Sequence, residues 1–141
     1  MVWFLVKLLD IITNSDGGSR GNPGEAAIGV LIRDGDNVIE TFKKRIGIAT
    51  NNEAEYWGLI SALELANQYT KSEVTCILDS ELVVKQMQGE YAVRKEELKS
   101  LFLKAQKLVD NFSSVKFKHV KRDDKFQIQA DKLVNAALDK A

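Results

Sequence analysis

The sequence contains only one cysteine, Cys76, and one proline among its 141 residues. A single cysteine excludes a disulfide within the chain and a zinc site built from several cysteines, so a metal site here would use oxygen ligands. The same scarcity favours a reducing compartment, and we expect a cytoplasmic protein. Little proline and glycine, with 45% hydrophobic and 28% charged residues, excludes collagen-like, low-complexity and disordered classes.

An excess of charge of one sign is also missing, because 20 basic residues balance 20 acidic ones. No overall field draws the protein to nucleic acid or to an anionic membrane, so a polyanion must be bound through a local patch or a metal. The one apolar run that resembles a membrane or targeting segment, MVWFLVKLL, has about half the length that crosses a bilayer. It lacks a basic start and a cleavage site, so we interpret it as part of the fold and expect no membrane association. The length predicts one domain over residues 1–141.

Extended runs at Leu5–Ser15, Ala27–Arg33 and Asn37–Ile46 open the chain, and the turn sequence Asp34–Asp36 joins the last two. They predict an antiparallel meander. Apolar side chains at helical spacing then predict a helix over Glu53–Gln68.

Asn51 or Asn52 is available as the N-cap of that helix. Short apolar runs and helical patterns then alternate, and because strands separated by helices pair in parallel, the whole order predicts an α/β fold. We expect a five-stranded mixed sheet, an antiparallel three-strand meander plus two parallel strands, flanked by helices. The remaining predicted elements are Val74–Leu78, Ser80–Gln88, Lys95–Asn111, Val115–Val120 and Gln127–Lys140.

Two acidic residues lie on helix faces that the pattern assigns to the core. Glu55 shares its stripe with Leu59, and Asp131 precedes Val134 and Leu138 by three and seven residues. Each also lies near the start of its helix, where acids interact favourably with the helix dipole, so either one alone has a structural explanation.

Two further acids lie where strands are predicted to end. Asp16 precedes Gly17 and Gly18 at the end of the first strand, and Asp79 follows an apolar strand. Turn formation and helix capping explain each of these singly. Four neighbouring carboxylates at interior positions, however, cost several kcal/mol each unless a cation or protons compensate their charge. Together the four acids therefore indicate a divalent metal site.

Four segments resemble type 1 ribonuclease H in order and spacing, from about residue 8 to the C-terminus. They are DGGSRGNPG at 16–24, TNNEAEY at 50–56, LDSELVVKQMQGEY at 78–91 and HVKR with ADKLVNAALD within 119–139. The resemblance is to the compact archaeal or bacterial form, and it implies a ribonuclease H-like fold. It also implies that Asp16, Glu55, Asp79 and Asp131 are the catalytic and metal-binding carboxylates.

The implied reaction is hydrolysis of the RNA strand of an RNA/DNA hybrid with two Mg²⁺ ions, or Mn²⁺ as a substitute, without sequence specificity. It leaves 5′-phosphate and 3′-hydroxyl ends. Carboxylates suit such ions because hard cations prefer oxygen ligands. Asp16 is expected to bridge both ions, Asp79 and Glu55 to hold one, and Asp131 to hold the more exposed one.

The resemblance also implies substrate-binding residues that read 2′-hydroxyls in the shallow minor groove, although turn formation and helix capping explain the asparagines equally. They are Gly17, Asn22, Thr50, Asn51 and Asn52. The implied partner is the hybrid, bound by a monomer.

Three features depart from the family pattern. Glu81 replaces a common glutamine, no basic handle is present, and the predicted loop Lys121–Ile128 is about two residues longer than in the compact motif. Arg122 matches the arginine of that motif, and we assign it a catalytic role in stabilising the leaving phosphate. His119 is expected to pack or bond locally.

Two other functions fit the same pattern. Junction resolvases and transposases have related folds, but the Asn-Pro-Gly and Thr-Asn-Asn motifs favour the hybrid. A nucleic-acid-binding module without chemistry is disfavoured because all four acids are present. Activity on double-stranded RNA stays open.

Overall fold

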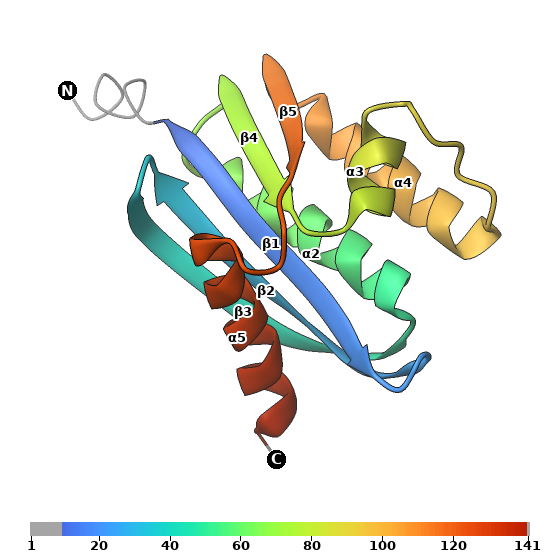
Figure 1. The fold of residues 1–141 in the computed structure, drawn as a ribbon. Helices are drawn as coiled ribbons and strands as arrows, with labels where there is room; N and C mark the ends of the chain where they lie inside the picture. Colours follow the sequence, from blue (N-terminus) through green and yellow to red (C-terminus); the bar gives the residue numbers. More distant parts are fainter. Residues whose placement is uncertain (1–9, 141) are drawn as a thin grey trace.

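The computed structural model describes residues 10–140, so the expectations for residues 1–9 lie outside the described part of the chain. Five strands form one mixed sheet in the order β3-β2-β1-β4-β5 (Figure 1). The pairs β1–β2 and β2–β3 are antiparallel, whereas β1–β4 and β4–β5 are parallel, which confirms the predicted fold class. The strands are β1 (Ile11–Arg20), β2 (Gly24–Asp34), β3 (Asn37–Ala49), β4 (Glu73–Leu78) and β5 (Ser114–His119).

Helices cover both faces of the sheet. Helix α5 lies on one face, in front of β1 and β2 in Figure 1, and α2 lies behind the sheet with α4 beyond it. The helices are α2 (Asn51–Ala66), α3 (Glu81–Met87), α4 (Glu96–Val109) and α5 (Lys125–Asp139).

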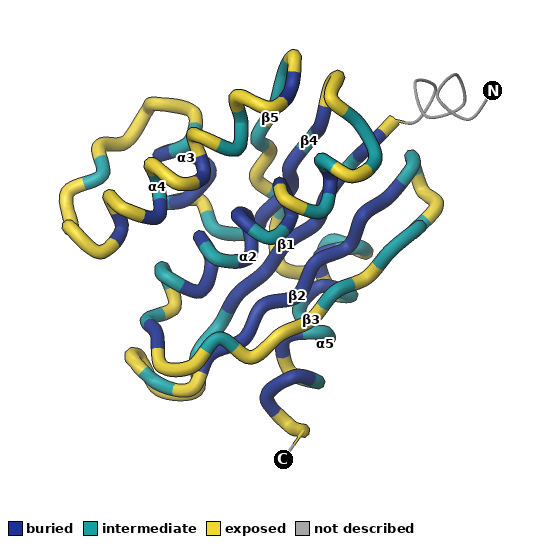
Figure 2. Tube along the Cα trace, turned by 180° about the vertical axis from the view of Figure 1, so that it is seen from behind, coloured by how far each residue is buried: buried dark blue, intermediate teal, exposed yellow. Residues whose placement is uncertain are grey.

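The larger core lies between the sheet and α2, as the buried stretch of α2 in Figure 2 shows. Tyr56, Leu59 and Leu63 are fully buried there, because α2 packs against the sheet on one side and α4 on the other. Cys76 is also fully buried in this core, and burial raises the pKa of its thiol to about 12. A smaller apolar cluster under α5 includes Val134 and Leu138.

The first strand extends beyond its predicted end at Ser15 and continues to Arg20, so Asp16 lies within the strand. The glycine pair after Asp16 suggested a turn, but it lies within the strand, and its first member, Gly17, is required for packing. A Cβ at Gly17 would lie 2.0 Å from the carbonyl oxygen of Ala54, so only glycine lets β1 approach α2. The turn comes later, where Gly21 has a φ of +94°.

Two helix starts also differ from the prediction. Thr50, not Asn51 or Asn52, is the N-cap of α2, and it forms a capping box with Glu53. Asp124 caps α5, which begins two residues before the predicted Gln127. The loop after β5 therefore ends at Asp124, and the predicted loop end at Ile128 is wrong.

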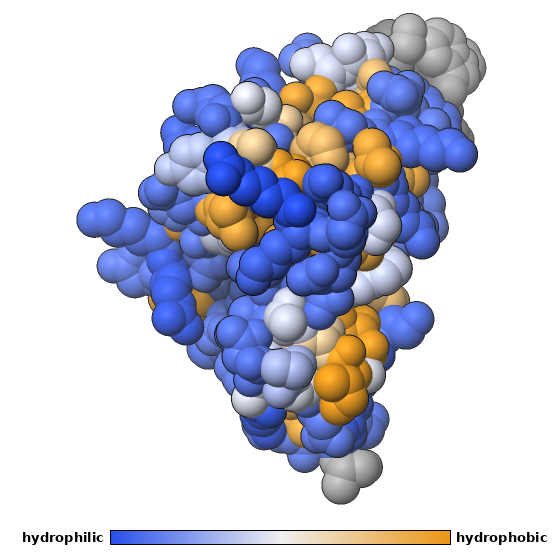
Figure 3. All heavy atoms as spheres, turned by 90° about the vertical axis from the view of Figure 1, so that its right-hand side faces the viewer, coloured by the Kyte–Doolittle hydropathy of each residue, from blue (hydrophilic) through white to orange (hydrophobic). Residues whose placement is uncertain are grey.

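Large exposed hydrophobic side chains among the described residues are scattered, at Ile48, Tyr91, Leu103 and Ile128. Figure 3 shows one side of the molecule, where hydrophilic side chains predominate and hydrophobic ones form small groups. Within residues 10–140, the helices are too short or too polar to cross a membrane.

Candidate active site

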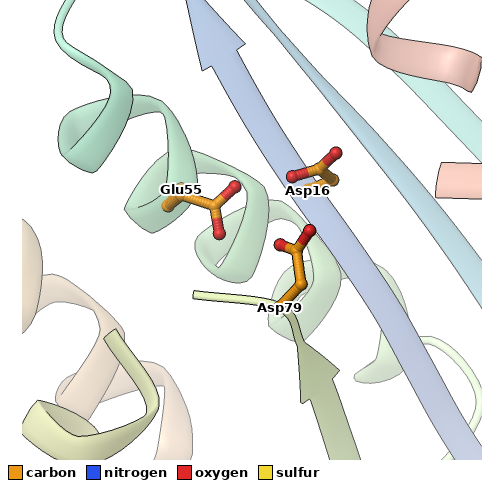
Figure 4. A group of neighbouring side chains, drawn as sticks. All are labelled: Asp16, Glu55 and Asp79. Carbon is orange, nitrogen blue, oxygen red and sulfur yellow. The ribbon is translucent and has the colours of Figure 1, made fainter. Parts of the chain in front are cut away.

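Three carboxylates meet where β1 separates from β4. The parallel pairing of these strands ends at Asn14 and Ile77, so Asp16 lies just beyond the last pair and Asp79 follows the end of β4. Glu55 points toward them from α2 (Figure 4). One carboxylate oxygen from each acid lies within 4.8 Å of the others. The sheet and α2 thus bring together three of the four predicted ligands.

The backbone orients two of these acids. The amide of Gly17 donates hydrogen bonds to Asp16 Oδ1 (2.9 Å) and to Glu55 Oε1 (2.8 Å). The second oxygen, Glu55 Oε2, is buried and has no hydrogen-bond partner within the described chain. A buried acceptor without a donor is costly, and together with two nearby carboxylates it fits a divalent cation with oxygen ligands.

Burial and mutual repulsion disfavour the charged forms of these acids. Burial raises the pKa of Asp16 to about 7, and the charges of Asp79 and Asp131 add to the shift. Burial, followed by the hydrogen bond and charge of Asp16, raises the pKa of Glu55 well above its usual range. The pKa of Asp79 is also raised by burial, although the positive charge of Arg122 opposes the rise. A bound cation would favour the ionised form of all three.

Asp131 lies outside the group of three but lines the same cleft of ≈ 380 Å³. It is half-buried on α5, and Asn135 Nδ2 donates to its Oδ2 (3.4 Å). Arg122 is exposed and also lines the cleft, and its catalytic role stays a prediction. All five predicted catalytic residues therefore border one cavity.

Two of the predicted substrate-binding asparagines connect the β1–β2 turn to α2. Asn51 Oδ1 accepts hydrogen bonds from Ser19 N (2.9 Å) and Ser19 Oγ (3.0 Å), and Asn22 Oδ1 accepts from Asn51 N (3.0 Å). Both side chains are exposed, and neither Nδ2 group donates a hydrogen bond within residues 10–140. Thr50 and Gly17 have the structural roles given above, and Asn52 is half-buried outside the cleft lining. Substrate binding by these five residues stays a prediction.

His119 lies at the end of β5, where its Nε2 is 3.2 Å from the carbonyl oxygen of Asp79. The residue is exposed, so it bonds locally, as expected, but does not pack in the core. Glu81 is exposed at the start of α3 and accepts a hydrogen bond from Tyr91 Oη (3.4 Å).

Asn135 and Arg20 are among the cleft residues that the sequence analysis did not assign to the site. Asn135 follows Asp131 by four residues, a spacing that places both on one helix face and could have identified it. Arg20 shares the strand face of Asp16, but a strand predicted to end at Ser15 could not reveal this.

A mixed sheet in this order, with carboxylates from its central strand, its neighbour and the first helix, defines the ribonuclease H-like class of folds. A family model described as reverse transcriptase-like matches residues 14–137. The solved RNase H1 of Halobacterium salinarum is 38% identical with a TM-score of 0.88, covering 94% of this chain and 99% of that one. LC11-RNase H1, isolated from compost and solved in complex with an RNA/DNA hybrid, is 42% identical with a TM-score of 0.87, covering 93% and 98%. The chain belongs to the reverse transcriptase-like family and, within it, to the compact type 1 ribonucleases H.

Some curated relatives are longer than this chain. A bifunctional protein of Mycobacterium tuberculosis is 39% identical over 135 residues, which cover 94% of this chain and 36% of that protein. Ribonuclease HI of Halobacterium salinarum is 39% identical over 127 residues, which cover 89% of this chain and 63% of that protein. The chain thus spans about a third of the first relative and under two thirds of the second.

Proposed function

We propose that this protein is an endoribonuclease that hydrolyses the RNA strand of RNA/DNA hybrids, using two Mg²⁺ ions held by Asp16, Glu55, Asp79 and Asp131. The cluster of three buried or half-buried carboxylates, with an unpartnered oxygen on Glu55, carries this proposal. The similarity to LC11-RNase H1, which was solved with such a hybrid, supports the substrate class.

Divalent cations in this site would polarise the scissile phosphate and favour deprotonation of water. The four carboxylates would hold these cations, which would offset the repulsion between the acids and the phosphate and bind the attacking water in the cleft. Water adds to phosphorus, the bond from phosphorus to the 3′ oxygen breaks, and that oxygen takes up a proton. Arg122 lies in the cleft as a permanent cation and stabilises negative charge on the departing phosphate, but it does not transfer protons.

The free amide groups of Asn22 and Asn51 are suited to bind 2′-hydroxyls, since their oxygens are already occupied by backbone and hydroxyl donors. These contacts are independent of base identity, so we expect cleavage without sequence preference. We include double-stranded RNA as a slower substrate, because its A-form minor groove also presents 2′-hydroxyls. We propose that the enzyme acts as a monomer in the cytoplasm, and that Mn²⁺ substitutes for Mg²⁺.

The test is cleavage of end-labelled RNA/DNA, RNA/RNA and DNA/DNA duplexes of one sequence, with Mg²⁺, with Mn²⁺ and with chelator. We expect the fastest cleavage on the hybrid, 5′-phosphate and 3′-hydroxyl ends, and no cleavage in chelator. Products with 2′,3′-cyclic phosphates would contradict attack by water, since they require attack by the 2′-hydroxyl. Preferred cleavage of DNA/DNA would instead favour a resolvase-like function.

A further inference from the structure

Helix α5 follows one face of β1 turn by turn. Alternate residues of a strand share a face, and two strand residues advance about 6.7 Å, close to the rise of one helical turn. Four pairs of residues therefore stay in step along the two elements. They are Asn14 with Gln127, Asp16 with Asp131, Gly18 with Val134, and Arg20 with Asp139.

The first of these pairs belongs to a buried hydrogen-bond network. Gln127 is fully buried, and its Nε2 donates to the carbonyl oxygen of Ser15 (2.7 Å) while its Oε1 accepts from Asn14 Nδ2 (3.1 Å). Asn14 Oδ1 in turn accepts from Arg33 Nε (2.8 Å). The guanidinium of Arg33, itself 5% exposed, lies 3.8 Å from the ring centroid of Phe126 on α5. We call Asn14, Arg33 and Gln127 the polar lock.

The other contacts of α5 specify its position less well. The helix backbone touches the sheet at Gly29, where a Cβ would lie 2.4 Å from the carbonyl oxygen of Ala130. Gly29 is the strand partner of Asp16, so this close approach occurs beside the active site. This contact includes no hydrogen bond that would fix the helix along the strand, and the Arg20–Asp139 ion pair at the far end is about half exposed and therefore weak. The buried hydrogen bonds of the polar lock are directional, so they fix the position of α5 along β1.

We propose that the polar lock is a positioning device that holds Asp131 against Asp16 in the catalytic arrangement. Gln127 precedes Asp131 by one helical turn on the same face, so a shift of Gln127 relative to β1 moves Asp131 by a similar distance. This inference rests on the proposed function only for its effect on rate. Its structural part, that the polar lock fixes the position of α5 on the sheet, is independent of any substrate.

The test uses Gln127→Met, which keeps the length of the side chain and removes both of its hydrogen bonds. Asn14→Leu is a second variant, which removes the donor to Gln127 and the acceptor for Arg33 without adding a charge beside the acids. In both variants we expect kcat on a hybrid to fall about tenfold to a hundredfold, with KM within about threefold of wild type, because misplacement of a catalytic group affects the reaction step more than binding. Amide hydrogen exchange in residues 125–131 should accelerate about tenfold relative to α2.

Leu101→Ala is the matched control, since it destabilises α4 on the opposite face of the sheet from α5. A similar loss of kcat in this control at equal stability would overturn the inference, because general destabilisation, and not a displaced α5, would then explain the loss of kcat. Unchanged kcat in Gln127→Met, with active wild type, would overturn the inference while leaving the proposed function intact. If the wild type cleaves no hybrid, the proposed function fails. Hydrogen exchange then decides the structural part: exchange in residues 125–131 that is not accelerated in the variants would show that the polar lock does not fix the position of α5.

Discussion

Asp16→Asn should stabilise the metal-free protein, because the native carboxylate is ionised and buried at high pH. The pKa of Asp16 rises from an ordinary value of 3.8 to about 7 in the folded protein. Since one pKa unit corresponds to about 1.4 kcal/mol, ionised Asp16 lowers the free energy of unfolding by about 4 kcal/mol above pH 7. Asparagine keeps the side-chain oxygen that accepts from Gly17 N and removes the charge.

The direction with pH follows from the raised pKa. Near pH 4 the carboxyl is largely protonated in the folded state, so variant and wild type should differ little. As the pH rises from about 4 through about 7, the wild type loses stability that the variant keeps. At pH 8.5 the variant should melt about 8–16 °C higher in chelator, given about 2–4 °C per kcal/mol for a domain of this size.

The measurement is thermal and urea unfolding in chelator at several pH values between 4.5 and 8.5, with and without Mg²⁺. Asp110→Asn, which removes an exposed acid at the end of α4, is the control for loss of one negative charge. Mg²⁺ should reduce the difference in melting temperature between the variant and the wild type, because it binds the folded wild type and stabilises it by mass action. A variant that is no more stable than wild type at pH 8.5 in chelator would refute the reasoning from charge burial.

Three further predictions concern catalysis and binding. Asp79→Asn and Glu55→Gln should each retain less than about a tenth of the hybrid-cleaving rate while remaining folded, and faster cleavage by both would overturn the assignment of metal ligands. Arg122→Ala should lower turnover about tenfold to a hundredfold with an unchanged melting temperature, whereas His119→Ala should retain turnover and lose some stability; the reverse result would exchange the two roles. The logarithm of the hybrid association constant should fall with the logarithm of salt concentration at a shallow slope, since no basic handle is present. A slope corresponding to about ten phosphate contacts would contradict this expectation.

Local sequence pattern was sufficient to predict the order of the strands and helices along the chain. It was also sufficient to single out the four acids that line one cleft. Hydrophobic periodicity reports which face of an element is buried, and Glu55 was visible as an acid within such a face. The end of β4 at Leu78 and the position of Asp79 beside it followed from an apolar run that stops abruptly. The mixed sheet followed as well, because helices between strands require parallel crossovers.

Contacts between distant segments decided the rest. The glycine pair after Asp16 has the composition of a turn, and only the proximity of Ala54 shows that Gly17 is required within a strand. The N-cap of α2 likewise depends on which polar residue meets the helix end, and the Asn51 side chain was instead occupied by Ser19 on β1.

The position of α5 on the sheet shows most clearly why the sequence pattern alone was insufficient. Periodicity shows that Asp131 lies on the apolar face of a helix, but it carries no information on which strand that face meets or at what register. Gln127, an ordinary polar residue in the sequence, is separated by 113 residues from its partner Asn14. Hydrogen bonds of this range depend on the three-dimensional path of the chain, so the sequence singled out the four candidate acids, and the packing of the helices on the sheet brings them to one cleft.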